Sequence, residues 1–423
     1  MRTTLLRLAP VLVSAILSTL MTTVLLGQPP DSARNNLALA KGTIYVSPTD
    51  EPIRDGVVLV QGNKITAVGR RGQVKIPPGT QVLDCSGLTI TAGFWNSHVH
   101  FFERKWANVA TIPAPELTRQ LQDMLTRYGF TSVFDLGSMW ENTRQLHDRI
   151  ESGEVAGPRI RSTGEALVAP HAVPPDTILR MLGFMSFPAP EIGNAEQATA
   201  AARKLIEEGV DGIKIHLQSP PPPNPPFPEA AIPAAVNEAH RAGKPTFVHP
   251  NTGADVLLAV RAGVDVVAHT TPRSGPWDET ILTAMKEHRV ALTPTLTLWK
   301  YSLRHDRIST QEQLVDTAVG QLRAWVQSEG TVLFGTDLGA IDYNPSDEYA
   351  LMAKAGMTFP QILASLTTAP AELFGDGKLV GRVAPGFQAD LVVLRDDPAK
   401  KIGALTAVQQ TLRAGKVVYR TGE

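Results

Sequence analysis

The chain of 423 residues contains a single cysteine, Cys85. One thiol excludes a framework of internal disulfides and a cluster of thiolate metal ligands. The net charge is −1, from 40 basic and 41 acidic side chains. No basic excess therefore points to nucleic acid, and the sequence has no acidic tail. Any bound metal must therefore use histidine, carboxylate or modified-lysine ligands.

The N-terminal segment has the pattern of a targeting sequence. Arg2 and Arg7 are followed by a largely apolar run, residues 8–30, that carries no charge. This pattern predicts a secretory signal peptide over residues 1–30 and export to the periplasm or the medium. The uncharged run is also long enough to span a bilayer, so an uncleaved N-terminal anchor is the alternative.

A repeated pattern of helix, glycine and β-branched strand occupies the middle of the chain. Glycine just past a helix is the usual left-handed cap, and continuous apolar runs are typical of parallel strands covered on both faces. Eight strands are predicted, at Ile90–His100, Thr131–Leu136, Arg159–Ala166, Val210–His216, Pro245–His249, Val264–His269, Ala291–Leu296 and Thr331–Asp337. Helical patterns lie between them, for example at Ala195–Glu208. The α/β pattern predicts a (β/α)8 TIM-like barrel, with a doubly wound open sheet as the alternative.

The two ends of the chain have a different pattern, with short strands and tight turns. Asp55-Gly56 is one of several turn signals between apolar segments near the N-terminus, and similar segments follow the barrel. We therefore predict a small β-sandwich domain formed by both chain ends, residues 31–90 and 373–423. The barrel, residues 91–372, is inserted between these two parts.

Histidine and aspartate side chains close several of the predicted strands. His98 and His100 alternate on one strand, so their imidazoles share a face with Cα atoms about 6–7 Å apart. His249, His269 and Asp337 each end a separate strand. Because the C-terminal ends of barrel strands converge, we expect these five side chains to form a metal site. Taken singly, each is also compatible with a core histidine or a helix-capping aspartate.

Lys214 lies between two isoleucines on the fourth predicted strand. Burying an ammonium group is costly, so this lysine must be neutral, ion-paired or modified. A neutral lysine can take up CO2 and form a carbamate that bridges two cations, whereas a salt-bridged lysine is the plainer alternative. His216, on the same strand face, and His171 and Tyr343, on predicted loops after the strands, are candidate substrate-binding residues.

Three segments of the chain resemble the amidohydrolase superfamily. Thr91–His100 resembles its first metal motif, and Ala384–Leu394 is similar to its C-terminal β-domain signature. Thr367–Ala371 is similar to the helical segment after its last barrel strand. The resemblance extends over nearly the whole chain after the N-terminal segment. It is greatest to the imidazolonepropionase-like branch, which includes metal-dependent dipeptidases and carboxypeptidases.

The resemblance implies a centre of two divalent metal ions, held by His98, His100, Lys214, His249, His269 and Asp337. The first two histidines and the aspartate would hold one ion, the later histidines would hold the other, and a carboxylated lysine would bridge them. Zinc suits this ligand set. A metal-bridged hydroxide would be the nucleophile, and Asp337 would accept its proton.

The predicted activity is hydrolysis of a C–N bond in a small substrate, such as a dipeptide or an N-acyl amino acid. The alternatives are a mononuclear deaminase or imidazolone-type ring hydrolase, a lactonase or phosphotriesterase, and a non-catalytic barrel. Deaminases of the superfamily carry a glutamate shortly after the fifth-strand histidine, and His249–Thr252 contains none. Asn96 stands where many relatives have aspartate, and this departure affects the surroundings of the metal rather than its ligands.

Overall fold

The computed structural model describes residues 36–170, 189–217, 226–302, 308–339 and 343–422. The predicted signal peptide or anchor at residues 1–30 and the candidate His171 lie outside these ranges. Within the described residues, no helix combines the length and the apolarity that a membrane crossing requires.

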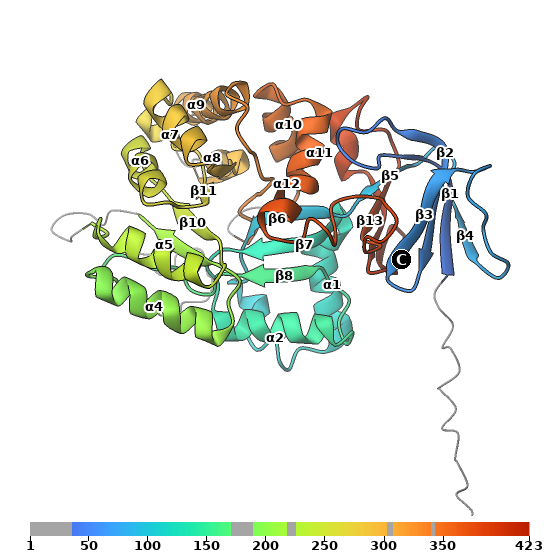
Figure 1. Ribbon diagram of the computed structural model, residues 1–423, viewed down its shortest axis with the longest axis horizontal. Coiled ribbons are helices and arrows are strands. Elements are labelled where there is room, and N and C mark those ends of the chain that lie inside the picture. The colour runs from blue at the N-terminus through green and yellow to red at the C-terminus, as the bar shows by residue number, and fades with distance from the viewer. Residues whose placement is uncertain (1–35, 171–188, 218–225, 303–307, 340–342, 423) are drawn as a thin grey trace, which may run out of the picture. The chain divides into compact units, whose positions relative to one another are not determined.

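Strands from both ends of the chain form one mixed sheet. Its eight strands are β1 (Asn36–Ile44), β2 (Ile53–Gln61), β3 (Lys64–Arg70), β4 (Gln81–Asp84), β5 (Thr89–Ala92), β13 (Leu391–Leu394), β14 (Val408–Arg413) and β15 (Lys416–Arg420). β5 joins the two halves, because it pairs in parallel with β1 and antiparallel with β13. Figure 1 shows β1–β4 to one side of the central strands.

The central strands are parallel. They are β6 (Phe94–Val99), β7 (Phe130–Asp135), β8 (Arg159–Ser162), β9 (Ile213–His216), β10 (Thr246–His249), β11 (Val266–Ala268) and β12 (Ala291–Thr293). They form one sheet of three strands and one of four, and single parallel bridges extend the pairing. These bridges are Leu167–Ile215, Leu292–Val332 and Val99–Leu338. The hydrogen-bonded series that begins at β6 therefore returns to β6.

Helices lie around the outside of these strands (Figure 1). They are α1 (Ala114–Met124), α2 (Trp140–Glu151), α4 (Ala195–Glu208), α5 (Ala231–Arg241), α6 (Gly253–Arg261), α7 (Glu279–Glu287), α8 (Leu296–Ser302), α9 (Ile308–Gln327), α10 (Ser346–Lys354), α11 (Phe359–Leu366) and α12 (Thr368–Leu373). α4 has the predicted bounds because both of its ends are capped. The Asn194 side chain accepts a hydrogen bond from the Gln197 amide, and Gly209 is left-handed with φ 101°.

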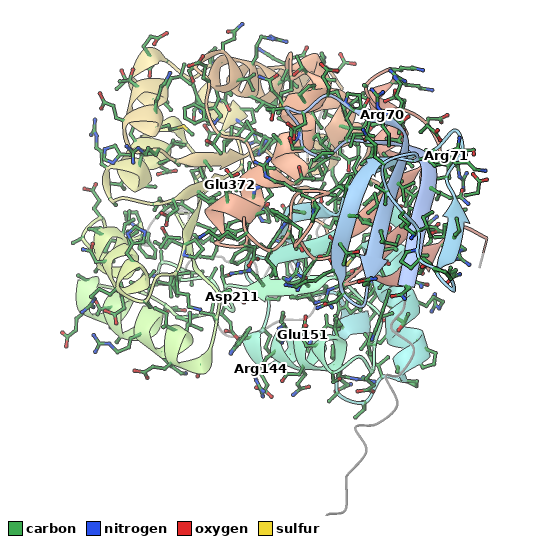
Figure 2. The ribbon with its side chains drawn as sticks, turned by 45° about the vertical axis from the view of Figure 1, so that its right-hand side comes forward. Arg70, Arg71, Arg144, Glu151, Asp211 and Glu372 are labelled. Atoms are coloured by element: carbon green, nitrogen blue, oxygen red, sulfur yellow. The ribbon has the colours of Figure 1, made fainter. Side chains whose placement is uncertain are left out.

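Aromatic side chains pack in a layer beneath the predicted ligands. The rings of Phe134 and Phe247 are 4.6 Å apart, and both pack against Phe374. Phe247 and His249 share one face of β10 because they are two residues apart. Beyond this layer, Asp211 lies at the end of β8 in Figure 2 and accepts a hydrogen bond from the Ser162 amide at 3.1 Å.

Several observed strands are shorter than predicted, and two strand predictions differ more substantially from the structure. The predicted strand Ile90–His100 is divided, because the chain leaves the mixed sheet after β5 and enters the parallel strands at Gly93. The predicted strand Thr331–Asp337 forms no ladder: Val332 makes one isolated parallel bridge, and the next bridge is made by Leu338, just past the predicted end. Its backbone is irregular, since Asp337 has φ 63°. Gly335 packs closely against His98: a Cβ atom added to Gly335 would lie 2.9 Å from the Cβ atom of His98.

Replacing Gly93 by alanine is expected to lower the free energy of unfolding by about 1–3 kcal/mol. A Cβ atom at this position would lie 2.1 Å from Thr131 Oγ1, so β6 and β7 would have to separate. Urea denaturation measures the effect. Gly320→Ala is the control, because a Cβ atom at that position in α9 meets nothing within 4 Å. The control should be stabilised by about 0.5–1 kcal/mol; equal midpoints for the two variants would contradict the prediction.

Candidate metal centre

Three predicted ligands meet where β6 and the segment 331–337 end. His98 Nε2 and His100 Nε2 are 3.2 Å apart, and Asp337 Oδ1 lies 3.3 and 2.8 Å from them. Two ligand atoms that share a tetrahedral zinc ion at about 2.0–2.1 Å are separated by about 3.4 Å. The three atoms therefore have close to the mutual spacing of ligands to one ion, and this group could bind a metal.

The other predicted histidines continue from this group in a row of rings. The ring of His269 lies 4.7 Å from that of His98 and 4.5 Å from that of His249. His216 is paired with His249 across β9 and β10, and the two rings stack at 4.0 Å with an interplanar angle of 11°. The structure thus brings all five predicted histidine and aspartate ligands together, with His216 at the end of the row.

Lys214 lies beside these rings on β9. Its side chain is 2% exposed, and Nζ has no hydrogen-bond partner among the described residues. Burial lowers the pKa of Lys214 to about 7, and the negative charge of Asp337 opposes this shift. The ion-paired alternative for this lysine therefore finds no support in the described contacts.

Three of these histidines are held in the neutral form that binds metal. Burial lowers the pKa values of His98, His249 and His269 well below the usual range, and the positive charges of their neighbours lower them further. Neutral imidazole has a free lone pair, and a metal ligand must be deprotonated. Each of these three neutral imidazoles therefore has one nitrogen lone pair available for a metal at neutral pH.

Backbone strain is concentrated at the same place. His269 and Asp337 have φ 99° and 63°, in the left-handed region that residues other than glycine seldom adopt. Gly339 has φ 102°, and a Cβ atom there would lie 2.4 Å from the carbonyl oxygen of His100. Strain of this kind persists where surrounding structure enforces it, which is common at functional sites. The chain after Asp337 must therefore pass close to the first pair of histidines.

Asn96 connects the two ligand-bearing segments. It is fully buried, and its Nδ2 donates to Thr336 Oγ1 at 2.8 Å. Its Oδ1 accepts hydrogen bonds from the amides of His98 and Thr336 at 3.2 and 3.3 Å. The asparagine thus ties the residue before Asp337 to β6.

Replacing Asn96 by alanine is expected to lower the free energy of unfolding by about 2–4 kcal/mol, because two backbone amides and one hydroxyl lose a buried partner. Urea denaturation of the metal-free protein measures this cost. The control is Asn237→Ala, an exposed asparagine on α5 that should change stability by less than about 0.5 kcal/mol. Equal stability of both variants would show that Asn96 does not hold the segments together.

Tyr343 connects the loop after β6 to the chain that follows Asp337. Its hydroxyl donates to the carboxylate of Glu103, and the Lys105 ammonium donates to the same hydroxyl. Lys105 also lies over the Tyr343 ring, 4.3 Å from its centroid. Sequence reasoning did not identify Glu103 or Lys105, although Glu103 follows His100 by only three residues.

Asp135 is a second residue of the site that the sequence analysis did not identify. It ends β7, is fully buried and accepts hydrogen bonds from the hydroxyls of Ser138, Thr143 and Ser162. Burial raises its pKa, and the charge of His100 opposes this shift. The sequence carried a usable signal, because Asp135 is the next-to-last residue of the predicted strand Thr131–Leu136, near the end at which the histidines lie on other strands.

The sequence profile of the Amidohydrolase family matches residues 89–418. The chain belongs to the amidohydrolase family. The protein is therefore a hydrolase that acts on carbon–nitrogen bonds of small-molecule substrates. Ochratoxinase from Aspergillus niger is 25% identical to this amidohydrolase over 420 residues, which cover 88% of this chain and 84% of the relative.

Solved structures share the fold of this amidohydrolase. A Xaa-Pro dipeptidase with bound methionine has a TM-score of 0.77 and 21% identity, covering 91% of this chain and 100% of that one. A prolidase complexed with N-methylphosphonate-L-proline has a TM-score of 0.74 and 26% identity, with the same coverage. These similarities agree with an α/β fold built on parallel strands.

Proposed function

We propose that this amidohydrolase cleaves the amide bond of N-acyl amino acids or dipeptides at a centre of two zinc ions. The observation that carries the proposal is the position of Lys214. A buried amine without a hydrogen-bond partner lies beside neutral histidines and Asp337. A metal-bridging role explains both the burial of the amine and the group of ligands around it.

The donor set divides between two ions. His98, His100 and Asp337 would hold the first ion, and His249 and His269 would hold the second. Lys214, whose Nζ has no hydrogen-bond partner among the described residues, would bridge the two ions once carboxylated. In that reaction the neutral amine attacks CO2, an N–C bond forms, one C=O electron pair moves to oxygen, and the nitrogen releases a proton to solvent. The product is a carbamate with one negative charge and two oxygen ligands.

Two zinc ions bound here would lower the pKa of a water molecule and polarise the substrate carbonyl. Asp337 would accept the proton of the attacking water and pass it to the departing amine. The short distances from Asp337 Oδ1 to both imidazoles support this role, because they put the carboxylate among the ligands of the first proposed ion. His216, which is stacked on His249, would face the substrate at the end of the row of rings.

The names of similar proteins support the substrate class. One similar structure is a prolidase that holds N-methylphosphonate-L-proline, and another is a Xaa-Pro dipeptidase. The phosphonate in that ligand places a tetrahedral phosphorus on the nitrogen of an amino acid, as hydrolysis of an N-acyl amino acid would place a tetrahedral carbon. We therefore favour amide bonds to the nitrogen of an amino acid.

We infer that the parallel strands close a (β/α)8 barrel over residues 91–372, and that residues 31–90 and 373–423 form a β-sandwich. The returning series of bridges supports closure, and the pairing of β5 with β13 supports a domain from both chain ends. We also propose that residues 1–30 direct export and that Tyr343 and His171 line the substrate site.

A panel assay tests the function. The zinc-loaded protein is expected to hydrolyse N-acyl amino acids or dipeptides, to leave lactones and phosphotriesters nearly unchanged, and to contain two zinc ions per chain. Elemental analysis and release of the free amino acid are the measurements. One zinc ion per chain with ring-opening or deaminase activity would reject the binuclear amide hydrolase.

A further inference from the structure

The hydroxyl of Thr295 lies between His269 and a backbone carbonyl. Thr295 Oγ1 is 2.6 Å from His269 Nδ1 and 2.9 Å from the carbonyl oxygen of Pro294. A hydroxyl has one proton, so it cannot donate to both atoms. Both contacts are hydrogen bonds only if the hydroxyl donates to Pro294 and accepts a proton from Nδ1 of the imidazole.

This arrangement selects one tautomer of His269. With the proton on Nδ1, the lone pair is on Nε2, the other nitrogen of the ring. A ligating histidine usually donates its other ring N–H to an oxygen, which fixes both the tautomer and the ring orientation. Thr295 therefore has the geometry of a positioning residue for His269.

The backbone that presents Thr295 is strained. Thr295 has φ 44°, which is unfavourable for a β-branched side chain, and His269 has φ 99°. The amide of His269 donates to the carbonyl oxygen of Thr293 at 2.8 Å, so the ends of β11 and β12 are fixed to each other. A strained residue keeps its conformation only when neighbouring groups enforce it.

Glu348 supplies this constraint from α10. Its carboxylate is fully buried; one oxygen accepts the Leu296 amide at 2.9 Å, and the other accepts the amide and hydroxyl of Thr297 at 2.8 Å each. A buried carboxylate is costly unless hydrogen bonds compensate it; burial raises the pKa of Glu348 to about 7, and the hydrogen bonds from Thr297 and Leu296 oppose this shift. Glu348 therefore fixes the two residues that directly follow Thr295.

We propose that Glu348 and Thr295 act as linked positioning residues that fix the tautomer and ring orientation of His269. Glu348 holds the first turn of α8, α8 holds Thr295, and Thr295 holds the imidazole. The inference rests on the proposed function, since it assigns His269 to the metal centre. The metal centre would then also depend on Glu348, which lies 79 residues after His269 on a helix that bears no proposed ligand.

The tautomer is measured directly on metal-free protein labelled with ¹⁵N in its histidine rings. Long-range ¹H–¹⁵N correlation spectra, assigned by comparison with His269→Gln, are expected to show a protonated Nδ1 in the wild type. Thr295→Val removes the acceptor and should give a mixture of tautomers at His269, whereas Thr295→Ser should keep the wild-type pattern. Glu348→Gln should shift the same resonances in the direction of Thr295→Val.

Zinc affinity is the second measurement, by competition with a chromogenic chelator. Thr295→Val is expected to weaken one zinc site about 10–100-fold, and Thr295→Ser should restore it. The matched control is Thr293→Val. Thr293 lies on β12, is equally buried, and its hydroxyl has no partner among the described residues. Circular dichroism confirms that each variant is folded.

The outcomes separate this inference from the proposed function. If Thr295→Val folds and keeps both the wild-type tautomer and the wild-type zinc affinity, the positioning role is rejected. If Thr293→Val weakens zinc as much as Thr295→Val, the effect comes from packing and the role is also rejected. If the wild type binds no zinc but Thr295→Val changes the tautomer, the positioning contact stands and the metal-dependent function fails.

Discussion

Replacing Asp337 by asparagine is expected to lower kcat about 10³-fold, since general acid–base catalysis contributes about 10²–10⁴-fold. Asp337 Oδ1 lies 2.8 and 3.3 Å from the Nε2 atoms of His100 and His98, where the proton of the attacking water would be released. Asparagine keeps the shape of the side chain and one oxygen atom. It cannot accept a proton at neutral pH, so substrate binding should survive while turnover is lost.

Steady-state kinetics and zinc analysis on the same preparation measure this effect. KM is expected to change by less than about threefold, because the loss lies in the transition state. Asp347→Asn is the matched control. The side chain of this half-buried aspartate on α10 pairs with Lys300, and such pairs are worth at most about 1 kcal/mol. An Asp337→Asn enzyme with wild-type kcat and two zinc ions would remove the aspartate from proton transfer.

The sequence was sufficient for the parts of the centre that depend on strand ends. His98, His249 and His269 follow apolar strands, and parallel strands bring their C-terminal ends together whatever the loops do. The structure confirms that these side chains meet. The amidohydrolase resemblance is confirmed as well, because the family profile matches residues 89–418.

The sequence was insufficient where the backbone conformation does not follow the hydrophobic pattern. Thr89–Ala92 and Phe94–Val99 read as one apolar run, but they belong to different sheets because the chain turns at Gly93. Asp337 was predicted at the end of a regular strand, but the segment makes isolated bridges in place of a ladder, and Asp337 itself has φ 63°. Periodicity describes which face a residue occupies and contains no information on a local left-handed backbone.

Contacts between residues far apart in the sequence could not be predicted either. Glu348 lies 51 and 52 residues from the amides that it binds, in a helix whose own pattern is ordinary. The sequence does not show whether a given glutamate is buried or exposed; only the folded structure does. Lys214 is the opposite case, because its isoleucine neighbours already predicted burial, and its side chain is 2% exposed.

Replacing Lys214 by alanine is expected to remove one of the two zinc ions and to lower kcat/KM about 10³-fold. The reason is electrostatic: a bridging carbamate would place a negative charge between two cations, and losing one cation removes several kcal/mol of transition-state stabilisation, at about tenfold per 1.4 kcal/mol. Zinc analysis and kinetics measure the two effects. Lys214→Met is the companion variant, because methionine fills the same buried volume without an amine.

Lys214→Ala and Lys214→Met differ in whether a small carboxylate can enter the space left by the lysine side chain. This difference tests whether the wild-type lysine carries a carbamate. Alanine leaves a cavity beside the histidines, so added acetate should enter, supply the missing carboxylate and restore part of the activity. Methionine fills the cavity, so acetate should not rescue it. Wild-type protein equilibrated with ¹³C-bicarbonate should give a carbamate resonance that both variants lack. If Lys214→Met retains two zinc ions and wild-type kcat/KM, the lysine is a packing residue and the two ions have another bridge.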